Sequence, residues 1–343
     1  MRPFDRDKVT GRMHETQERS VNVSGRGTSK KKAGHSMESD RPSGDSKPLS
    51  LWERISFFAA HTAASALLLV LGLRGLYRFG RLFGTVEWLI NYKRRRRFAR
   101  ALQSLSCDGA TGHHKPSAAR AYFMRSRCDK IFYLILDRLS RERAVSLYTI
   151  TNKDWLDEAV SQGRGVYLAL SHNGDHHIGA MFMSLLGYKV AGVRDRHEGG
   201  LRRFVLDRFD QRYPEFRRAR YLFADSYPRD IYRCLQDGYV LASAMDVGRI
   251  RGNPRGIVEL TMFGEKRPFL SGPLRVAVRC GVPVIQGFVI SEPDFHYRLE
   301  LVEKLIDPED SNGKEADILG ALTVYASNIE TKIRGMPELL TRI

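Results

Sequence analysis

Short apolar runs alternate with amphipathic stretches from about residue 146 onward. Val166–Leu170 reads as a buried strand, and residues 176–186 after it carry apolar positions at helical spacing. The same alternation predicts strands at 189–193, 221–224, 239–245, 258–263, 284–290 and 297–301, a turn at 265–267, and helices at 201–209, 226–236, 273–279 and 316–334. Such alternation is typical of α/β folds with parallel strand pairs. We therefore expect one α/β domain over 93–343, with a mixed, partly parallel sheet flanked by helices.

The pattern before this domain predicts two further segments. Residues 1–48 are rich in Ser, Gly and charged side chains, so they cannot bury enough apolar surface to offset the entropy of ordering, and we expect a disordered tail. Residues 49–92 are expected to form a membrane-anchoring helix and an interfacial segment. Within them, Ile55–Leu73 has 19 residues without a formal charge, and a helix needs about 20 to cross a bilayer core. The stretch fits a single span and also a helix that lies in the interface.

The charge of the chain adds a partner to this picture. A formal net charge of +17 and a pI near 9.9 predict an anionic partner, which is nucleic acid, an acidic membrane surface or an acidic substrate. The basic run Lys93–Arg97 closely follows the apolar stretch and an aromatic, basic segment. This order favours an anionic membrane surface over nucleic acid, and the positive-inside rule places the run and the following domain in the cytoplasm.

A dense polar cluster, Ser171 to His177, directly follows the strand Val166–Leu170. Reactive groups in α/β sheets often lie at the carboxyl ends of strands, and amides at the start of the next helix can stabilise developing negative charge. His172 is therefore the candidate catalytic residue, and Gly174 lets backbone or substrate approach closely. The sequence contains no P-loop, no GxGxxG and no GxSxG, which argues against nucleotide hydrolysis, dinucleotide redox chemistry and serine hydrolysis.

A metal site is a second interpretation of the same cluster, because His172, Asp175, His176 and His177 are all ligand types. Adjacent residues on a helix point about 100° apart, so His176 and His177 cannot easily bind one ion. We expect no metal at this position.

The cluster and several later motifs together resemble the lipid A biosynthesis (lauroyl/myristoyl-type) acyltransferases, within the lysophospholipid and glycerol-phosphate acyltransferase superfamily. The resemblance rests on the segment from Gly163 to Val190, then on Met245-Asp246, Phe263-Gly264, Ser271-Gly272-Pro273 and Gly281-Val282-Pro283-Val284, in this order. It covers roughly residues 55–335.

The resemblance implies a single acyltransferase domain at the inner (cytoplasmic) membrane. Such an enzyme moves a fatty acyl chain from an acyl thioester, on acyl carrier protein or coenzyme A, to a hydroxyl or amine of a membrane lipid. It needs no metal or redox cofactor, and His172 takes the role of general base.

The partner of the base is left open, because His177 occupies the position where the family has an acidic residue, five places after His172. Asp175 is one candidate partner and Asp246, at the end of a later strand, is another. A third possibility is that His177 acts with some other partner. The remaining alternative is a catalytically silent membrane-bound protein that binds lipid or serves as a scaffold.

Substrate-binding residues are expected in the loops around this cluster. Arg194 and Arg249 lie near strand ends and are candidates to hold a phosphorylated acceptor or the nucleotide part of an acyl carrier. The resemblance adds Gly174, Ser271 and Gly272 to the expected substrate-binding residues.

Overall fold

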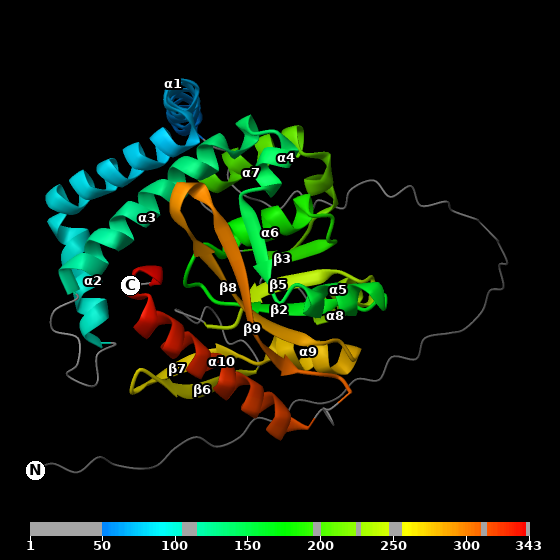
Figure 1. Cartoon of the computed structure of the whole chain (residues 1–343). Coiled ribbons are helices and arrows are strands. Elements are labelled where there is room, and N and C mark those ends of the chain that lie inside the picture. Colours follow the sequence, from blue (N-terminus) through cyan, green and yellow to red (C-terminus); the bar gives the residue numbers. More distant parts are fainter. Residues whose placement is uncertain are drawn as a thin grey trace, which may run out of the picture. The chain divides into compact units, whose positions relative to one another are not determined.

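A seven-stranded sheet lies at the centre of the part of the chain that the computed structural model describes, which is residues 50–104, 115–194, 200–223, 228–246, 256–309 and 314–340 (Figure 1). The strand order is β1-β9-β8-β2-β5-β3-β4. The strands are β1 (Tyr148–Thr151), β2 (Val166–Leu170), β3 (Val190–Arg194), β4 (Arg220–Phe223), β5 (Val240–Ala244), β8 (Val284–Ser291) and β9 (Tyr297–Ile306). All neighbouring pairs are parallel except β8 and β9. The fold is therefore α/β with a mixed, mostly parallel sheet.

Helices flank this sheet (Figure 1). They are α1 (Leu51–Ile90), α2 (Tyr92–Ser104), α3 (Lys115–Ile135), α4 (Arg141–Val145), α5 (Asp154–Ser161), α6 (His176–Leu185), α7 (Gly200–Arg212), α8 (Pro228–Gln236), α9 (Gly272–Cys280) and α10 (Glu315–Gly335). Short 3₁₀ helices are η1 (Leu136–Arg138), η2 (Pro214–Arg218), η3 (Pro293–Phe295) and η4 (Pro337–Leu339). The described residues belong to one compact unit, Ser39–Ile343. The tail predicted over residues 1–48 lies outside the described residues.

The side chains of β2 alternate between two hydrophobic cores. Val166, Leu168 and Leu170 pack with residues of α3, α6 and α7, whereas Tyr167 and Ala169 pack with residues of α8, α9 and α10. Successive side chains of a strand point to opposite faces, so each face of the sheet has its own core. β2 is therefore buried along its whole length, and the residues that follow it start from a strand that is packed on both faces.

The predicted strands and helices from 166 onward are confirmed, with boundaries shifted by a few residues. The predicted turn at 265–267 is wrong, because these residues begin β7 (Glu265–Leu270), which pairs antiparallel with β6 (Ile257–Met262). The hairpin turns instead at Phe263 and Gly264, whose φ angles are 56° and 74°. A two-residue hairpin loop with positive φ at both positions matches the twist of the flanking strands. The charged residues 265–267 can therefore pair with β6 as the first residues of β7.

Helix α1 begins with a capping box and breaks in its middle. The Glu53 N–H donates to the Ser50 hydroxyl, and the Ser50 N–H donates to the Glu53 carboxylate. Gly72 has a φ of 64°, which is outside the helical range and divides α1 into segments 51–71 and 73–90. Within the described residues, α1 is the one helix long and apolar enough to cross a membrane, which is a weak indication of membrane association.

The second segment of α1 packs closely on α3. A Cβ atom at Gly84 would lie 2.6 Å from the Cα atom of Met124, and one at Gly80 would lie 3.1 Å from the Cys128 sulfur. Glycine at these two positions, one helical turn apart, lets the two helix backbones approach each other. The second segment is therefore held along α3, at the surface of the α/β domain (Figure 1).

Candidate active site

His172 and Asp246 emerge side by side at one edge of the sheet. His172 follows β2 and Asp246 follows β5, and these two strands are parallel neighbours in which Leu170 pairs with Ala244. Parallel strands end at the same edge of a sheet, so the residues that follow them meet there although they are 74 positions apart in the chain. The register of β2 and β5 is thus the cause of the contact.

The His172 ring is oriented by two acceptors on Asp246. Its Nδ1 atom lies 2.7 Å from the backbone carbonyl oxygen of Asp246 and 3.2 Å from the carboxylate Oδ1. Because both neighbours accept hydrogen bonds, the network assigns the proton of the neutral ring to Nδ1 and leaves Nε2 as the basic nitrogen. The side chain is 20% exposed, so the ring is accessible from solvent. This is the tautomer that a general base of this geometry requires.

Two donors and a tyrosine hydroxyl surround the Asp246 carboxylate. The backbone N–H of His172 lies 3.1 Å from both carboxylate oxygens, the Ser171 hydroxyl donates to Oδ2 at 3.0 Å, and the Tyr325 hydroxyl lies 3.0 Å from Oδ1. Burial alone would raise the pKa of Asp246, but the hydrogen bonds from His172 and Ser171 outweigh it and lower the pKa below its ordinary value. The carboxylate is therefore ionised at neutral pH and is placed to stabilise a protonated His172.

Tyr325 joins this arrangement from the middle of α10. Its hydroxyl also lies 2.6 Å from the carbonyl oxygen of Leu170 and accepts a hydrogen bond from the Met245 N–H at 3.2 Å. The side chain is fully buried. A single phenol thus contacts the ends of both strands that carry His172 and Asp246. Sequence reasoning missed Tyr325, because nothing in the apolar pattern of α10 distinguishes it from a core residue, and it missed Ser171, whose position beside His172 was the available signal.

Asp175 contacts a different group. Its carboxylate is buried and accepts a hydrogen bond from the Tyr133 hydroxyl at 2.9 Å, while its second oxygen, Oδ2, has no hydrogen-bond partner among the described residues. Burial, and then the nearby carboxylate of Asp129, raise the pKa of Asp175 to about 7. Of the two predicted carboxylate partners, the structure brings Asp246 to His172.

The two following histidines start α6 and point to different neighbours. The ring of His176 lies edge-on to that of His172, with centroids 5.4 Å apart, and Nε2 of His177 lies 3.2 Å from Nη1 of Arg202 on α7. His177 therefore faces α7. No group of three or more His, Cys, Asp or Glu side chains is arranged to hold a metal ion in the ranges that the structure describes.

Gly174 is required by the packing of the loop. Its φ is 85°, and a Cβ atom there would lie 2.3 Å from the carbonyl oxygen of Val289 in β8. Its N–H donates to the carbonyl oxygen of Leu339 at 2.9 Å. The close approach expected at Gly174 is therefore made by the protein's own backbone, which holds the loop after His172 against β8.

The remaining predicted binding residues are partly outside the described regions. Ser271 is fully buried and its hydroxyl donates to the carbonyl oxygen of Gly256 at 2.7 Å, and Gly272 begins α9. Ser271 and Gly272 therefore form the start of α9. Arg194 ends β3, and its side chain lies outside the described residues, as does the whole of Arg249.

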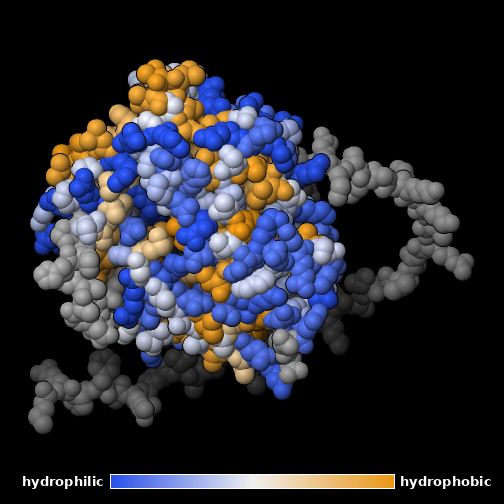
Figure 2. Space-filling view, in the orientation of Figure 1, coloured by the Kyte–Doolittle hydropathy of each residue, from blue (hydrophilic) through white to orange (hydrophobic). Residues whose placement is uncertain are grey.

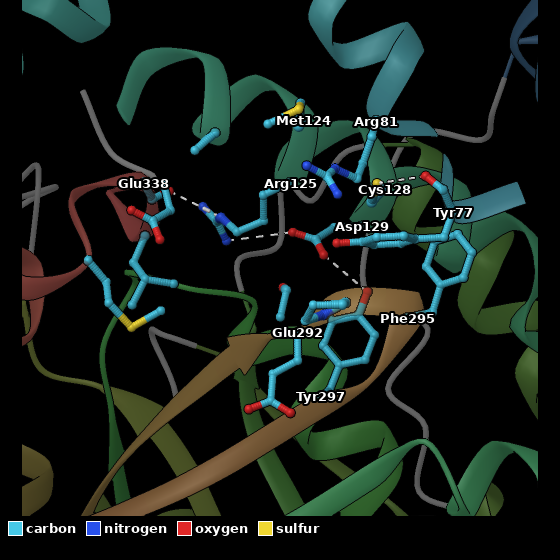
Figure 3. A pocket seen from close by; sticks show the side chains of 15 residues that line it. Tyr77, Arg81, Met124, Arg125, Cys128, Asp129, Glu292, Phe295, Tyr297 and Glu338 are labelled. Carbon is cyan, nitrogen blue, oxygen red and sulfur yellow. Dashed lines mark hydrogen bonds and ion pairs between the residues drawn. The ribbon is translucent and has the colours of Figure 1, made fainter. Parts of the chain in front are cut away.

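A cavity of about 230 Å³ adjoins the loop of the candidate active site, between α1, α3, η3 and η4 (Figure 3). Arg125 lies at its centre, where Nη1 is 3.5 Å from the Asp129 carboxylate and Nε donates to the carbonyl oxygen of Glu338 at 3.1 Å. The Tyr297 hydroxyl donates to Asp129 at 3.0 Å. Leu339, which receives the hydrogen bond from Gly174, is part of the cavity wall. The cavity and the His172 loop therefore share a backbone contact.

No model of a known protein family matches the sequence, and a search of curated proteins finds no significant match.

Proposed function

We propose that the chain is an acyltransferase of the lipid A biosynthesis type. It transfers a fatty acyl chain from an acyl thioester, carried by acyl carrier protein or coenzyme A, to a hydroxyl or amine of a membrane glycolipid or phospholipid. The observation that carries the proposal is the contact of His172 with Asp246 at the carboxyl edge of the sheet. The order of the sequence motifs supports the same function.

The proposed reaction uses His172 as general base. Nε2 removes the proton from the acceptor hydroxyl as its oxygen attacks the carbonyl carbon of the thioester, and the carbonyl becomes a tetrahedral oxyanion. The oxyanion then collapses, the carbon–sulfur bond breaks, and the leaving thiolate takes the proton from the imidazolium. The Asp246 carboxylate stabilises the positive ring in between. The proposed reaction requires no metal or redox cofactor.

Substrate binding is proposed for the loops and for the membrane surface. Arg194 is the last residue of β3 and Arg249 comes three residues after Asp246 in the chain, and we assign both to the anionic part of the acceptor or donor. The exposed members of the basic run at the start of α2, Lys93, Arg96 and Arg97, are proposed to contact anionic lipid headgroups at the cytoplasmic face of the inner membrane.

The test is an acyl-transfer assay on the purified full chain in lipid nanodiscs. Labelled acyl-coenzyme A and acyl-carrier protein are each offered with bacterial glycolipid and phospholipid acceptors, and products are read by mass spectrometry. Wild type is expected to transfer label, His172→Ala to lose about 10²- to 10⁴-fold in rate, and His296→Ala, at a half-buried histidine in another loop, to match wild type. Equal rates for wild type and His172→Ala would end the proposal. A wild type that binds lipid vesicles but transfers no label would favour the silent lipid-binding alternative.

A further inference from the structure

Helix α1 carries an exposed apolar surface along both of its segments. Large side chains that point to solvent include Trp52, Leu69 and Val70 in the first segment and Leu82, Leu89 and Ile90 in the second, each more than half exposed. Figure 2 shows apolar residues gathered over both parts of α1. A patch of this extent on a folded protein marks a membrane or protein contact.

The middle of the first segment is nevertheless docked on the domain. His61 is 1% exposed, and its Nε2 lies 3.0 Å from both carboxylate oxygens of Asp137. One turn later, the Ser65 hydroxyl accepts a hydrogen bond from Nε of Arg138 at 3.0 Å. The ring of Phe204 on α7 lies edge-on to His61, with centroids 6.2 Å apart. Polar and aromatic contacts therefore fix this segment to η1 and α7.

The surroundings of this contact are strongly polar. Asp137 also accepts a hydrogen bond from Nε of Arg208 at 2.8 Å. A hollow beside it is lined by Asp137, Arg138, Arg208, Gln211 and Arg212. The groups that hold the centre of segment 51–71 thus belong to a charged surface of the domain.

This docking conflicts with a span across the bilayer. Segment 51–71 is about 31 Å long at 1.5 Å per residue, close to the roughly 30 Å of a bilayer core. If it crossed, His61 would lie near the midplane and would bring Asp137, Arg138 and Arg208 with it. Charged groups at that depth are strongly disfavoured unless they line a protein interior or a water-filled cavity. A helix lying in the plane of the membrane leaves these groups on the domain side and its apolar side chains in lipid.

The second segment fits the same arrangement. Leu76, Gly80 and Gly84 face α3, and the opposite side is apolar with exposed arginines at its edges, including Arg74 and Arg78. This distribution is that of an interfacial helix whose cations meet phosphate headgroups. The break at Gly72 changes the direction of the chain between the two segments, so α1 is not one straight 40-residue helix.

We infer that α1 attaches the protein to one leaflet of an anionic membrane and does not cross it, so that residue 50 and the α/β domain stay on the same side. This inference goes beyond the proposed function and holds whether or not the chain transfers acyl groups. The partner is the lipid surface itself, recognised by apolar insertion and by arginine–phosphate contacts.

The test is the protease sensitivity of tags on the full chain, expressed in a bacterial host. One tag precedes Met1 and another follows Ile343. Both tags are expected to be cleaved in inverted membrane vesicles and protected in spheroplasts. A matched control chain carries a polyleucine segment in place of residues 51–73, preceded by a segment that is exported across the membrane. It shows the pattern of tag cleavage expected when this part of the chain crosses the membrane. Cleavage of the N-terminal tag alone in spheroplasts would overturn the inference, as would recovery of the protein in the soluble fraction.

A second measurement excludes a helical hairpin that crosses twice. Leu71, which is 42% exposed, adjoins the break and is changed to cysteine. A membrane-impermeant thiol reagent is expected to leave Leu71→Cys unlabelled in spheroplasts, at the level of the parent chain. Labelling from outside would place the break on the far side of the membrane and overturn the inference.

Discussion

The hydroxyl of Tyr325 lies 3.0 Å from the carboxylate of Asp246 and links helix α10 to the candidate catalytic pair. Replacing Tyr325 with Phe removes a contact to Asp246 and a hydrogen bond to the Leu170 carbonyl while it keeps the ring. We expect a rate of acyl transfer several-fold lower at unchanged KM, and a loss of about 1 kcal/mol in the free energy of unfolding. Steady-state kinetics and urea denaturation measure the two effects. A Tyr325→Phe chain with wild-type kcat would show that the hydroxyl only supports packing.

Asp246→Asn tests the charge of the proposed partner of His172. The amide keeps the shape of the side chain but cannot stabilise an imidazolium, and its NH₂ group competes for the acceptor position facing Nδ1. We expect a fall in kcat of about 10²- to 10⁴-fold. Asp175→Asn is the matched control, because Asp175 contacts Tyr133 and not the His172 ring, and it should keep kcat within about tenfold. The reverse ranking of the two variants would assign the role to Asp175.

Asp175 should also make the stability of the protein depend on pH. Its pKa is raised to about 7 from an ordinary 3.8, so the folded state holds a proton that the unfolded state has released between these values. The contribution of Asp175 to the free energy of unfolding is therefore largest below pH 4 and falls as the pH rises to 7. The total fall is about 1.4 kcal/mol for each unit by which the pKa in the folded state exceeds that in the unfolded state. In Asp175→Asn this loss is absent, so the variant should gain stability relative to wild type between pH 5 and pH 8. Thermal unfolding at both pH values measures the difference. A constant gap between the two proteins would contradict the prediction.

Asp246 should act in the opposite direction. Its pKa is lowered, so its ionised form is stabilised by folding. That contribution is present above the ordinary carboxyl pKa and is lost as the pH falls through the lowered value. Asp246→Asn should therefore lose more stability, relative to wild type, at pH 7 than at pH 3. Urea midpoints at these two pH values give the comparison, and an equal loss at both would count against the assignment.

Gly84→Ala tests the close contact of α1 with α3. The added methyl would meet the backbone of Met124 at 2.6 Å, so the two helices must separate. We expect a loss of about 1–3 kcal/mol, as for other overpacked positions. The matched control is Gly320→Ala in α10, where the new Cβ would meet no atom of another described element within 4 Å and the helix gains about 0.5–1 kcal/mol. Thermal unfolding in detergent compares the two variants. Similar melting temperatures for both would mean that α1 and α3 are loosely packed.

The elements around the site could be predicted because their signals are local. The uninterrupted apolar run of β2 and the helical spacing of α6 are properties of neighbouring residues, and together they locate His172 at a strand end. β1 was missed because Tyr148–Thr151 alternates with threonines and is too short to show a clear period. The break in α1 at Gly72 was not predicted because four glycines, at positions 72, 75, 80 and 84, lie in this part of the chain, and nothing in the sequence distinguishes Gly72 from Gly75.

The contacts of the site could not be chosen from the sequence alone. The choice between Asp175 and Asp246 depends on β5 lying beside β2, and strand order is a property of the whole fold. Tyr325 reaches Leu170 across 155 positions of the chain, and His61 reaches Asp137 across 76. Each of these contacts joins elements that are far apart in the sequence, so neither hydrophobic periodicity nor motif spacing predicts them.

The contact of Gly174 with β8 limits which sequence changes laboratory evolution can make in the loop after His172. No side chain fits between Gly174 and the Val289 carbonyl, and the positive φ adds strain for any other residue. A library randomised at this position should return glycine almost exclusively. Variation in this loop belongs instead at positions such as His177, whose partner Arg202 lies on a different helix and can change with it.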